Sequence, residues 1–276
     1  MPVRLPRPRF ARSGLAGALI CLAAAAAWAS PEPSALASSA TGAAATHHAA
    51  VAQPGPLAQF GSTRVSAGVR EVANWAFFTR DNRGRAVVIL DKHEATVYAF
   101  DPQGKLLATA PALLGLTIGD DTPPGVGDKP LSEIPEHERT TPAGRFIAQP
   151  GEDDTGVDVV WLDYGAAVAM HRVITTFPAQ RRPERLASPD PKVRRISYGC
   201  INLPIPFYEQ VLSPTVRKIG AVVYVLPETR PPGEVFGSWD VTDPAARPPA
   251  GAPAASARPA SPQAHALRTA AAAAGF

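Results

Sequence analysis

One cysteine in the last third of the chain has the neighbours of a presented thiol. Cys200 follows Gly199 and is followed by a short apolar stretch that ends at Pro204. Gly199 permits a tight turn beside the sulfur, and Pro204 ends the extended backbone soon after it. Most free cysteines behave as small buried hydrophobic residues, but a thiol becomes a nucleophile when a base can reach it. Cys200 is therefore a candidate nucleophile.

The candidate base for this thiol is His171, which lies in the apolar run 166–174. An imidazole can take a proton from a thiol and later return one to a leaving amine. The backbone amides of Tyr198, Gly199 and Cys200 are candidate donors to the oxyanion of an acyl-transfer intermediate, because a turn at Gly199 can point several N–H groups one way. A histidine between apolar neighbours can equally be a packed residue of a strand, and the sequence leaves both interpretations open.

Residues 1–29 have the organisation of a secretory signal. Four arginines precede the apolar run 15–27, and Ala27-Trp28-Ala29 matches a signal-peptidase site. The apolar run is short and rich in alanine, so a lasting membrane span is not expected. Cleavage after Ala29 would remove Cys21 and leave Cys200 as the single cysteine. We therefore expect export to the periplasm or the cell envelope.

The charge of the chain argues against nucleic acid as a partner. The whole sequence has 27 Lys and Arg against 24 Asp and Glu, a net charge of +3. Removing the four arginines of residues 1–29 leaves 23 basic residues against 24 acidic ones, a net charge of −1. The basic isoelectric point thus belongs to the N-terminal segment. His47 and His48 are adjacent but have no further ligands nearby, so neither a metal site nor another cofactor is expected.

Composition divides the remainder of the chain into three parts. Residues 30–66 and 229–276 are dominated by Ala, Pro, Ser and Gly, which cannot bury enough apolar surface to offset the entropy of ordering. We expect the first to be a disordered linker and the second a disordered tail. The range 67–228 contains the apolar runs and has the length of one domain.

Within that range the pattern predicts a mainly β fold with few short helices. Helical spacing over 67–79 ends at the turn 81–84, and a short helix is predicted at 206–212. Strands are predicted at 86–90, 95–100, 105–114, 140–147, 158–162, 166–174 and 221–226, the first three as an antiparallel meander and 158–174 as a hairpin. The long segment 115–139 is typical of a lid or binding loop, and 175–195 is a polar, basic excursion.

The order of these pieces resembles the L,D-transpeptidase catalytic domain, the YkuD family. The matching residues are Thr-Pro-Ala-Gly-Arg-Phe at 141–146, His171, and Ser-Tyr-Gly-Cys-Ile-Asn at 197–202. The resemblance implies a β-sandwich or barrel with Cys200 as nucleophile and His171 as acid and base. It also implies oxyanion or substrate-binding roles for Ser197, Tyr198, Gly199 and Asn202.

The substrates that the resemblance implies are peptidoglycan stem peptides, with a role in cell wall biogenesis and cell shape. Cys200 would attack the carbonyl of the L-centre of a diamino acid and release D-alanine, leaving a thioester. An amine acceptor would complete transpeptidation, whereas water would make the protein an L,D-carboxypeptidase. A backbone carbonyl near His171 is expected to orient the imidazole. Arg172, Arg194 and Arg195 are candidates to bind the carboxylates of the stem peptide, or else are solvated surface charges.

Three departures from the family pattern keep other functions open. Tyr198 stands where the family usually has histidine before the Gly-Cys pair, and a tyrosine cannot act as a base near neutral pH. Arg172 replaces a common glycine, and the segment between His171 and Ser197 is longer than usual. The alternatives are a catalytically silent peptidoglycan-binding module and an exported cysteine hydrolase of another specificity.

Overall fold

The computed structural model describes residues 53–246. The predicted signal 1–29, most of the predicted linker 30–66 and the residues after 246 lie outside this range, as do His47 and His48. Between residues 53 and 246, no helix has the length and apolarity to cross a membrane. The same residues contain no group of three or more His, Cys, Asp or Glu side chains placed to hold a metal ion.

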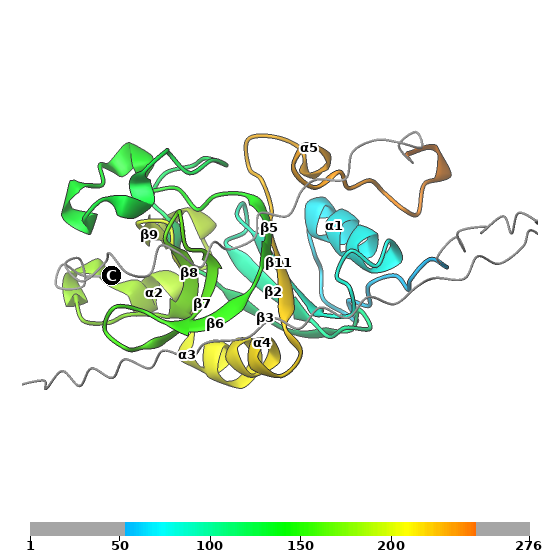
Figure 1. Cartoon of the computed structure of the whole chain (residues 1–276), viewed down its shortest axis with the longest axis horizontal. Helices are drawn as coiled ribbons and strands as arrows, with labels where there is room; N and C mark the ends of the chain where they lie inside the picture. Colours follow the sequence, from blue (N-terminus) through cyan, green and yellow to red (C-terminus); the bar gives the residue numbers. More distant parts are fainter. Residues whose placement is uncertain (1–52, 247–276) are drawn as a thin grey trace, which may run out of the picture. The chain divides into compact units, whose positions relative to one another are not determined.

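A five-stranded sheet forms the centre of the described structure (Figure 1). Its order is β3-β2-β1-β11-β5. The strands are β1 (Ala86–Asp91), β2 (Thr96–Phe100), β3 (Leu106–Pro111), β5 (Gly144–Ile147) and β11 (Ala221–Val225). The predicted antiparallel meander β1-β2-β3 is confirmed. The last strand, β11, pairs in parallel with β1 and thereby becomes an inner strand of the sheet.

A second sheet of four strands has the order β10-β8-β7-β6. Its strands are β6 (Gln149–Glu152), β7 (Asp158–Asp163), β8 (Val168–Arg172) and β10 (Ile201–Leu203). The predicted hairpin over 158–174 is confirmed as the antiparallel pair β7-β8. β10 is parallel to β8. A short parallel pair joins β4 (Leu114–Gly115) to β9 (Arg195–Ser197), and β9 comes just before β10 in sequence.

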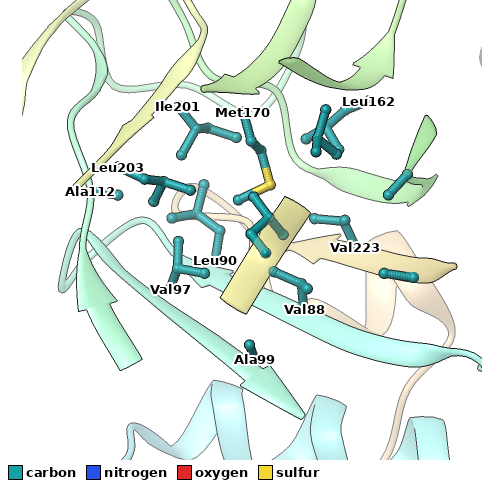
Figure 2. Close-up of a cluster of buried hydrophobic side chains, with 14 of the residues drawn as sticks. Val88, Leu90, Val97, Ala99, Ala112, Leu162, Met170, Ile201, Leu203 and Val223 are labelled. Atoms are coloured by element: carbon teal, nitrogen blue, oxygen red, sulfur yellow. The ribbon is translucent and has the colours of Figure 1, made fainter. Parts of the chain in front are cut away.

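The main core fills the space between the two sheets (Figure 2). Successive residues of a strand point to opposite faces, so Val88 and Leu90 of β1 share this core with Met170 of β8 and Ile201 of β10. The intervening residues, such as Ile89, pack in a second cluster with the first helix. Because both faces of β1 are covered, all of its residues are buried. The predicted mainly β fold is confirmed, as two packed sheets.

Short helices complete the fold. The predicted helix at 67–79 is confirmed as α1 (Ala67–Phe78), and the Ser66 hydroxyl caps it by accepting from the Val69 amide at 3.2 Å. The short helix predicted at 206–212 is part of a longer run: α3 (Ile205–Phe207), the π-helix η6 (Tyr208–Leu212) and α4 (Ser213–Ile219). The remaining helices are α2 (Arg182–Ala187), α5 (Pro232–Phe236), η1 (Val126–Asp128), η2 (Leu131–Glu133), η3 (Glu136–Glu138), η4 (Pro178–Gln180), η5 (Pro191–Arg194) and η7 (Pro244–Ala246).

The folded region extends beyond the predicted limits of 67 and 228. Phe60 and Phe236 are both buried in the cluster around α1, although they fall in the predicted linker and tail. The Gln59 amide donates to the Gly104 carbonyl at 2.8 Å, which ties the segment before α1 to the turn between β2 and β3. Composition averaged over a window overlooks single aromatic residues that anchor a polar segment, and this explains the correction.

Candidate active site

The candidate nucleophile and base lie on the outer face of the second sheet. Met170 and Ile201 point into the core between the sheets (Figure 2). Since side chains alternate along a strand, His171 points to the opposite face of β8, and Asn202 to that same face of β10. The register pairs Asn202 directly with His171. Cys200, two residues before Asn202, follows the same alternation.

One cavity contains both Cys200 and His171 in its wall. Its apolar floor includes Val159, Trp161 and Ala169, the outward-facing residues of β7 and β8, against which Cys200 packs. Further wall residues come from the turn before β10, from α2 and from the segment 117–140, which contains η1, η2 and η3. The sequence-predicted pair is therefore brought together in a partly enclosed space.

The imidazole of His171 is fixed in one orientation. Its Nδ1 lies 2.7 Å from the carbonyl oxygen of Arg172. A carbonyl only accepts, so Nδ1 carries the proton and Nε2 carries the lone pair. The side-chain amide of Asn202 lies 3.4 Å from Nε2. A backbone carbonyl therefore orients the ring, as predicted, and leaves a basic nitrogen facing the cavity side of the sheet.

Burial lowers the pKa of His171 to about 4. The positive charge of Arg182 acts in the same direction, while the hydrogen bond to the Arg172 carbonyl and the charge of Asp153 oppose the shift. The imidazole is consequently neutral near pH 7. A neutral imidazole has a lone pair that can accept a proton from a thiol, and the lowered pKa makes His171 a weaker base than an ordinary histidine.

This titration makes part of the stability pH-dependent. The pKa of His171 is about 4 in the folded chain against 6.5 as its ordinary value. Between these values the unfolded chain binds more protons, so the free energy of unfolding contributed by His171 is complete above about pH 7 and is lost as the pH falls to 4, by about 3 kcal/mol. Urea unfolding from pH 4 to 8 checks this. His171→Gln is expected to show a shallower pH dependence, and identical curves for the two proteins would contradict it.

The turn before β10 is held by Ser197. Its hydroxyl donates to the Cys200 carbonyl at 2.5 Å and accepts from the Gly199 amide at 3.2 Å. Gly199 has a φ of +138°, and a Cβ atom there would lie 2.8 Å from the carbonyl oxygen of Thr140. This close approach requires glycine. Because the Gly199 amide is engaged by Ser197, it is not the ready oxyanion donor that the sequence suggested.

Cys200 and Tyr198 both face the cavity. The thiol of Cys200 is half-buried, and its Sγ lies 3.4 Å from the carbonyl oxygen of Ala167, to which it donates. The ring of Tyr198 lies beneath the guanidinium of Arg139, 4.2 Å from ring centroid to Cζ. Tyr198 thus links the turn before β10 to the end of the segment 117–140.

Three arginines predicted as carboxylate-binding candidates lie elsewhere. Arg172 forms ion pairs with Asp158 at 2.7 Å and Glu209 at 2.8 Å. Arg195 forms an ion pair with Glu228, and Arg194 donates to the Ser188 carbonyl at 2.6 Å. None of the three is in the cavity wall. Side chains alternate between the two faces of a strand. Arg172 directly follows His171 on β8, so its side chain points away from the cavity.

Sequence reasoning did not assign the charged residues of the cavity wall, and the most buried of them is Arg182 at the start of α2. Only 2 % of its surface is exposed, and its Nη1 donates to Asn202 Oδ1 at 2.6 Å. Arg182 and the buried Leu186 are four residues apart, on one face of α2. That spacing was the available signal that Arg182 points inward rather than into solvent.

The segment 117–140 covers the cavity closely. A Cβ atom at Gly127 in η1 would lie only 2.0 Å from the carbonyl oxygen of Gly165, in the turn between β7 and β8. The two backbones are therefore in contact, which only glycine permits at that position. At its base the segment is closed by the Thr117 amide, which donates to the Arg139 carbonyl at 3.0 Å. The predicted binding loop thus contributes directly to the wall around Cys200.

No family model and no curated protein matches the chain. Solved structures are similar to part of it. The catalytic domain of an E. faecium L,D-transpeptidase is 18 % identical over 52 % of this chain and 98 % of that one, with a TM-score of 0.31. An L,D-transpeptidase from Xylanimonas cellulosilytica is 17 % identical over 51 % of this chain and 60 % of that one, with a TM-score of 0.30.

The chain resembles L,D-transpeptidase catalytic domains. The helical cell shape determining protein Pgp2 from Campylobacter jejuni is also similar, at 14 % identity over 53 % of this chain and 49 % of Pgp2, with a TM-score of 0.34. The chain thus spans about half to three fifths of several of the proteins it resembles.

Proposed function

We propose that the protein is a cysteine acyltransferase that acts on peptidoglycan stem peptides by L,D-transpeptidation. The observation that carries the proposal is the placement of Cys200 and the neutral, carbonyl-oriented His171 in the wall of one cavity. A nucleophile, a base and a group that orients the base are the parts of a covalent acyl-transfer site.

Catalysis would begin with proton transfer from Cys200 to Nε2 of His171. The thiolate attacks the carbonyl carbon of the L-centre in the peptide bond to the terminal D-alanine. The resulting tetrahedral oxyanion collapses, the C–N bond breaks, and the imidazolium returns the proton to the leaving amine. A thioester on Cys200 remains. An amine acceptor then attacks the thioester and His171 takes its proton, restoring the thiol and forming a new amide.

The substrate class is supported by sequence motifs rather than by contacts. Ser197 to Asn202 and Thr141 to Phe146 are the residues that resemble the L,D-transpeptidase pattern, and both pieces lie together. The Thr141 hydroxyl donates to the Gly199 carbonyl at 2.9 Å, so the motif at 141–146 holds the motif at 197–202 in place. The predicted signal at 1–29 favours the same substrate, because stem peptides lie outside the cytoplasmic membrane.

Mass spectrometry of products tests the proposal. The purified chain is incubated with a disaccharide tetrapeptide from peptidoglycan. We expect release of D-alanine, an acyl adduct on the proteolytic fragment that contains Cys200, and dimeric muropeptides. The matched control is the same protein alkylated beforehand at Cys200, which should give none of these products.

Other products would contradict the proposal in distinct ways. Tripeptides without dimers would identify water as the acceptor and an L,D-carboxypeptidase. Binding of muropeptides without an adduct or D-alanine release would indicate a silent binding module. An adduct with unrelated peptide esters alone would indicate a cysteine hydrolase of another specificity.

A further inference from the structure

Arg182 is a buried cation without an anionic partner among residues 53–246. Its Nε donates to Gln180 Oε1 at 2.6 Å and its Nη1 to Asn202 Oδ1 at 2.6 Å, both neutral acceptors. No carboxylate of the described residues lies within ion-pair distance of it. Lys129, the other cation in the cavity wall, is already paired with Glu138 at 2.5 Å. A desolvated guanidinium is costly unless an anion balances it.

The guanidinium of Arg182 is not fully used by the hydrogen bonds that hold it in the cavity wall. Arg182 lines the same cavity as Cys200 and Tyr198. Its Nη2 donates to no group of the described structure, so one edge of the guanidinium remains available. A planar guanidinium with a free edge matches a carboxylate.

We infer that Arg182 binds the terminal carboxylate of the residue that leaves when Cys200 attacks, and so selects peptides with a free C-terminus. The inference rests on the proposed function. In such a peptide only the leaving nitrogen and one Cα separate the attacked carbonyl carbon from the terminal carboxylate. A cation beside the sulfur is therefore near that carboxylate, while the other carboxylates of a stem peptide lie further along the chain.

The position of Arg182 follows from local backbone geometry. The preceding residue, Arg181, has a φ of +50° and ends the 3₁₀ turn η4, so the chain changes direction between the two arginines. The side chain of Arg181 is 72 % exposed, whereas Arg182 turns inward above Leu186. Because Arg181 is exposed and Arg182 is buried, removing the charge of Arg181 is a matched control for removing that of Arg182.

A small reagent tests the carboxylate site without any peptide. Iodoacetate and iodoacetamide both alkylate a thiolate with loss of iodide, but only iodoacetate carries a carboxylate next to the attacked carbon. We expect the ratio of the iodoacetate rate to the iodoacetamide rate to be higher for Cys200 than for free cysteine. Arg182→Gln should lower this ratio by roughly tenfold, since a charge-assisted hydrogen bond is lost.

Matched variants separate binding from structure. Arg181→Gln makes the same charge change at an exposed position and should leave the ratio unchanged. Arg182→Lys keeps the positive charge and should retain most of the elevated ratio of iodoacetate to iodoacetamide rates. A purely structural role would change both alkylation rates in parallel, so an unchanged ratio in Arg182→Gln would overturn the inference.

Peptides then extend the test to the substrate. Tetrapeptides with a free C-terminal carboxylate are compared with the same peptides carrying a C-terminal amide. The wild-type preference for the free acid, expected to be tenfold or more in kcat/KM, should disappear in Arg182→Gln. Equal preference in both proteins would overturn the inference. If neither peptide acylated Cys200, the proposed function would fail, while the alkylation ratio would still decide whether Arg182 binds a carboxylate.

Discussion

Replacing His171 by asparagine is expected to lower the acylation rate of Cys200 by about 10³-fold, the usual contribution of a positioned general base. Asparagine can still donate from its amide to the Arg172 carbonyl, as Nδ1 of His171 does at 2.7 Å. It has no basic nitrogen to replace Nε2. The variant therefore removes the base with little change in the packing beneath it. The measurement is single-turnover formation of the acyl adduct on a tetrapeptide donor.

The control for this variant is His93→Asn, which changes an exposed histidine in the turn after β1 that is absent from the cavity wall. It should acylate at the wild-type rate. Alkylation of Cys200 by iodoacetamide near pH 7 is expected to slow in His171→Asn as well, because His171 no longer takes the thiol proton. Wild-type acylation in His171→Asn would remove the imidazole from the mechanism.

Replacing Lys92 by methionine is expected to lower the free energy of unfolding by about 3–5 kcal/mol, because it removes the nearest counter-charge of the buried Asp120 carboxylate. Lys92 is fully buried and forms ion pairs with Asp120 at 2.8 Å and Glu228 at 3.4 Å. Burial tends to raise the pKa of Asp120, but hydrogen bonds from Lys92, Thr229 and two backbone amides hold that pKa well below its ordinary range. The carboxylate is thus charged in the fold and depends on Lys92.

The same substitution should also affect the site. Nζ of Lys92 donates to the Gly119 carbonyl at 2.5 Å and to the Thr141 carbonyl at 2.9 Å, so it joins the two ends of the segment 117–140 over the cavity. Urea unfolding gives the loss of stability, and Lys105→Met, at an exposed position, should be within about 0.5 kcal/mol of wild type. A Lys92→Met protein as stable as wild type would show that the ion pairs of Lys92 with Asp120 and Glu228 do not contribute to stability.

Local patterns predicted much of this fold because its hairpins are local. Runs of β-branched residues and turn residues located β1, β2, β7 and β8, and the 3.6-residue spacing located α1. The parallel pairs β1-β11 and β10-β8 join segments far apart in sequence, so spacing could not reveal them. The short β6 was missed because Gln149-Pro150-Gly151-Glu152 has the composition of a turn.

The same division holds for the site. The sequence singled out Cys200 because it is a lone cysteine beside a glycine. It singled out His171 because a histidine is unusual in an apolar strand. Arg182 was counted with its exposed neighbours, because its burial and its hydrogen bond to Asn202 arise only in the folded chain. Arg172 and Arg195 were predicted to be available for a substrate carboxylate. They are instead paired with carboxylates of the chain itself, which come from distant elements. Charge sign is readable from a sequence, but charge pairing is a tertiary property.

The parallel pairing of β1 with β11 has a consequence for how the chain is made. Ala86 pairs with Ala221, so the middle of the five-stranded sheet stays incomplete until the last strand has emerged from the ribosome. Until then, one edge of β1 has unpaired backbone N–H and C=O groups, and β5 has no neighbour in its sheet. Such high contact order slows folding. The five-stranded sheet can therefore close only after nearly the whole folded region has been synthesised.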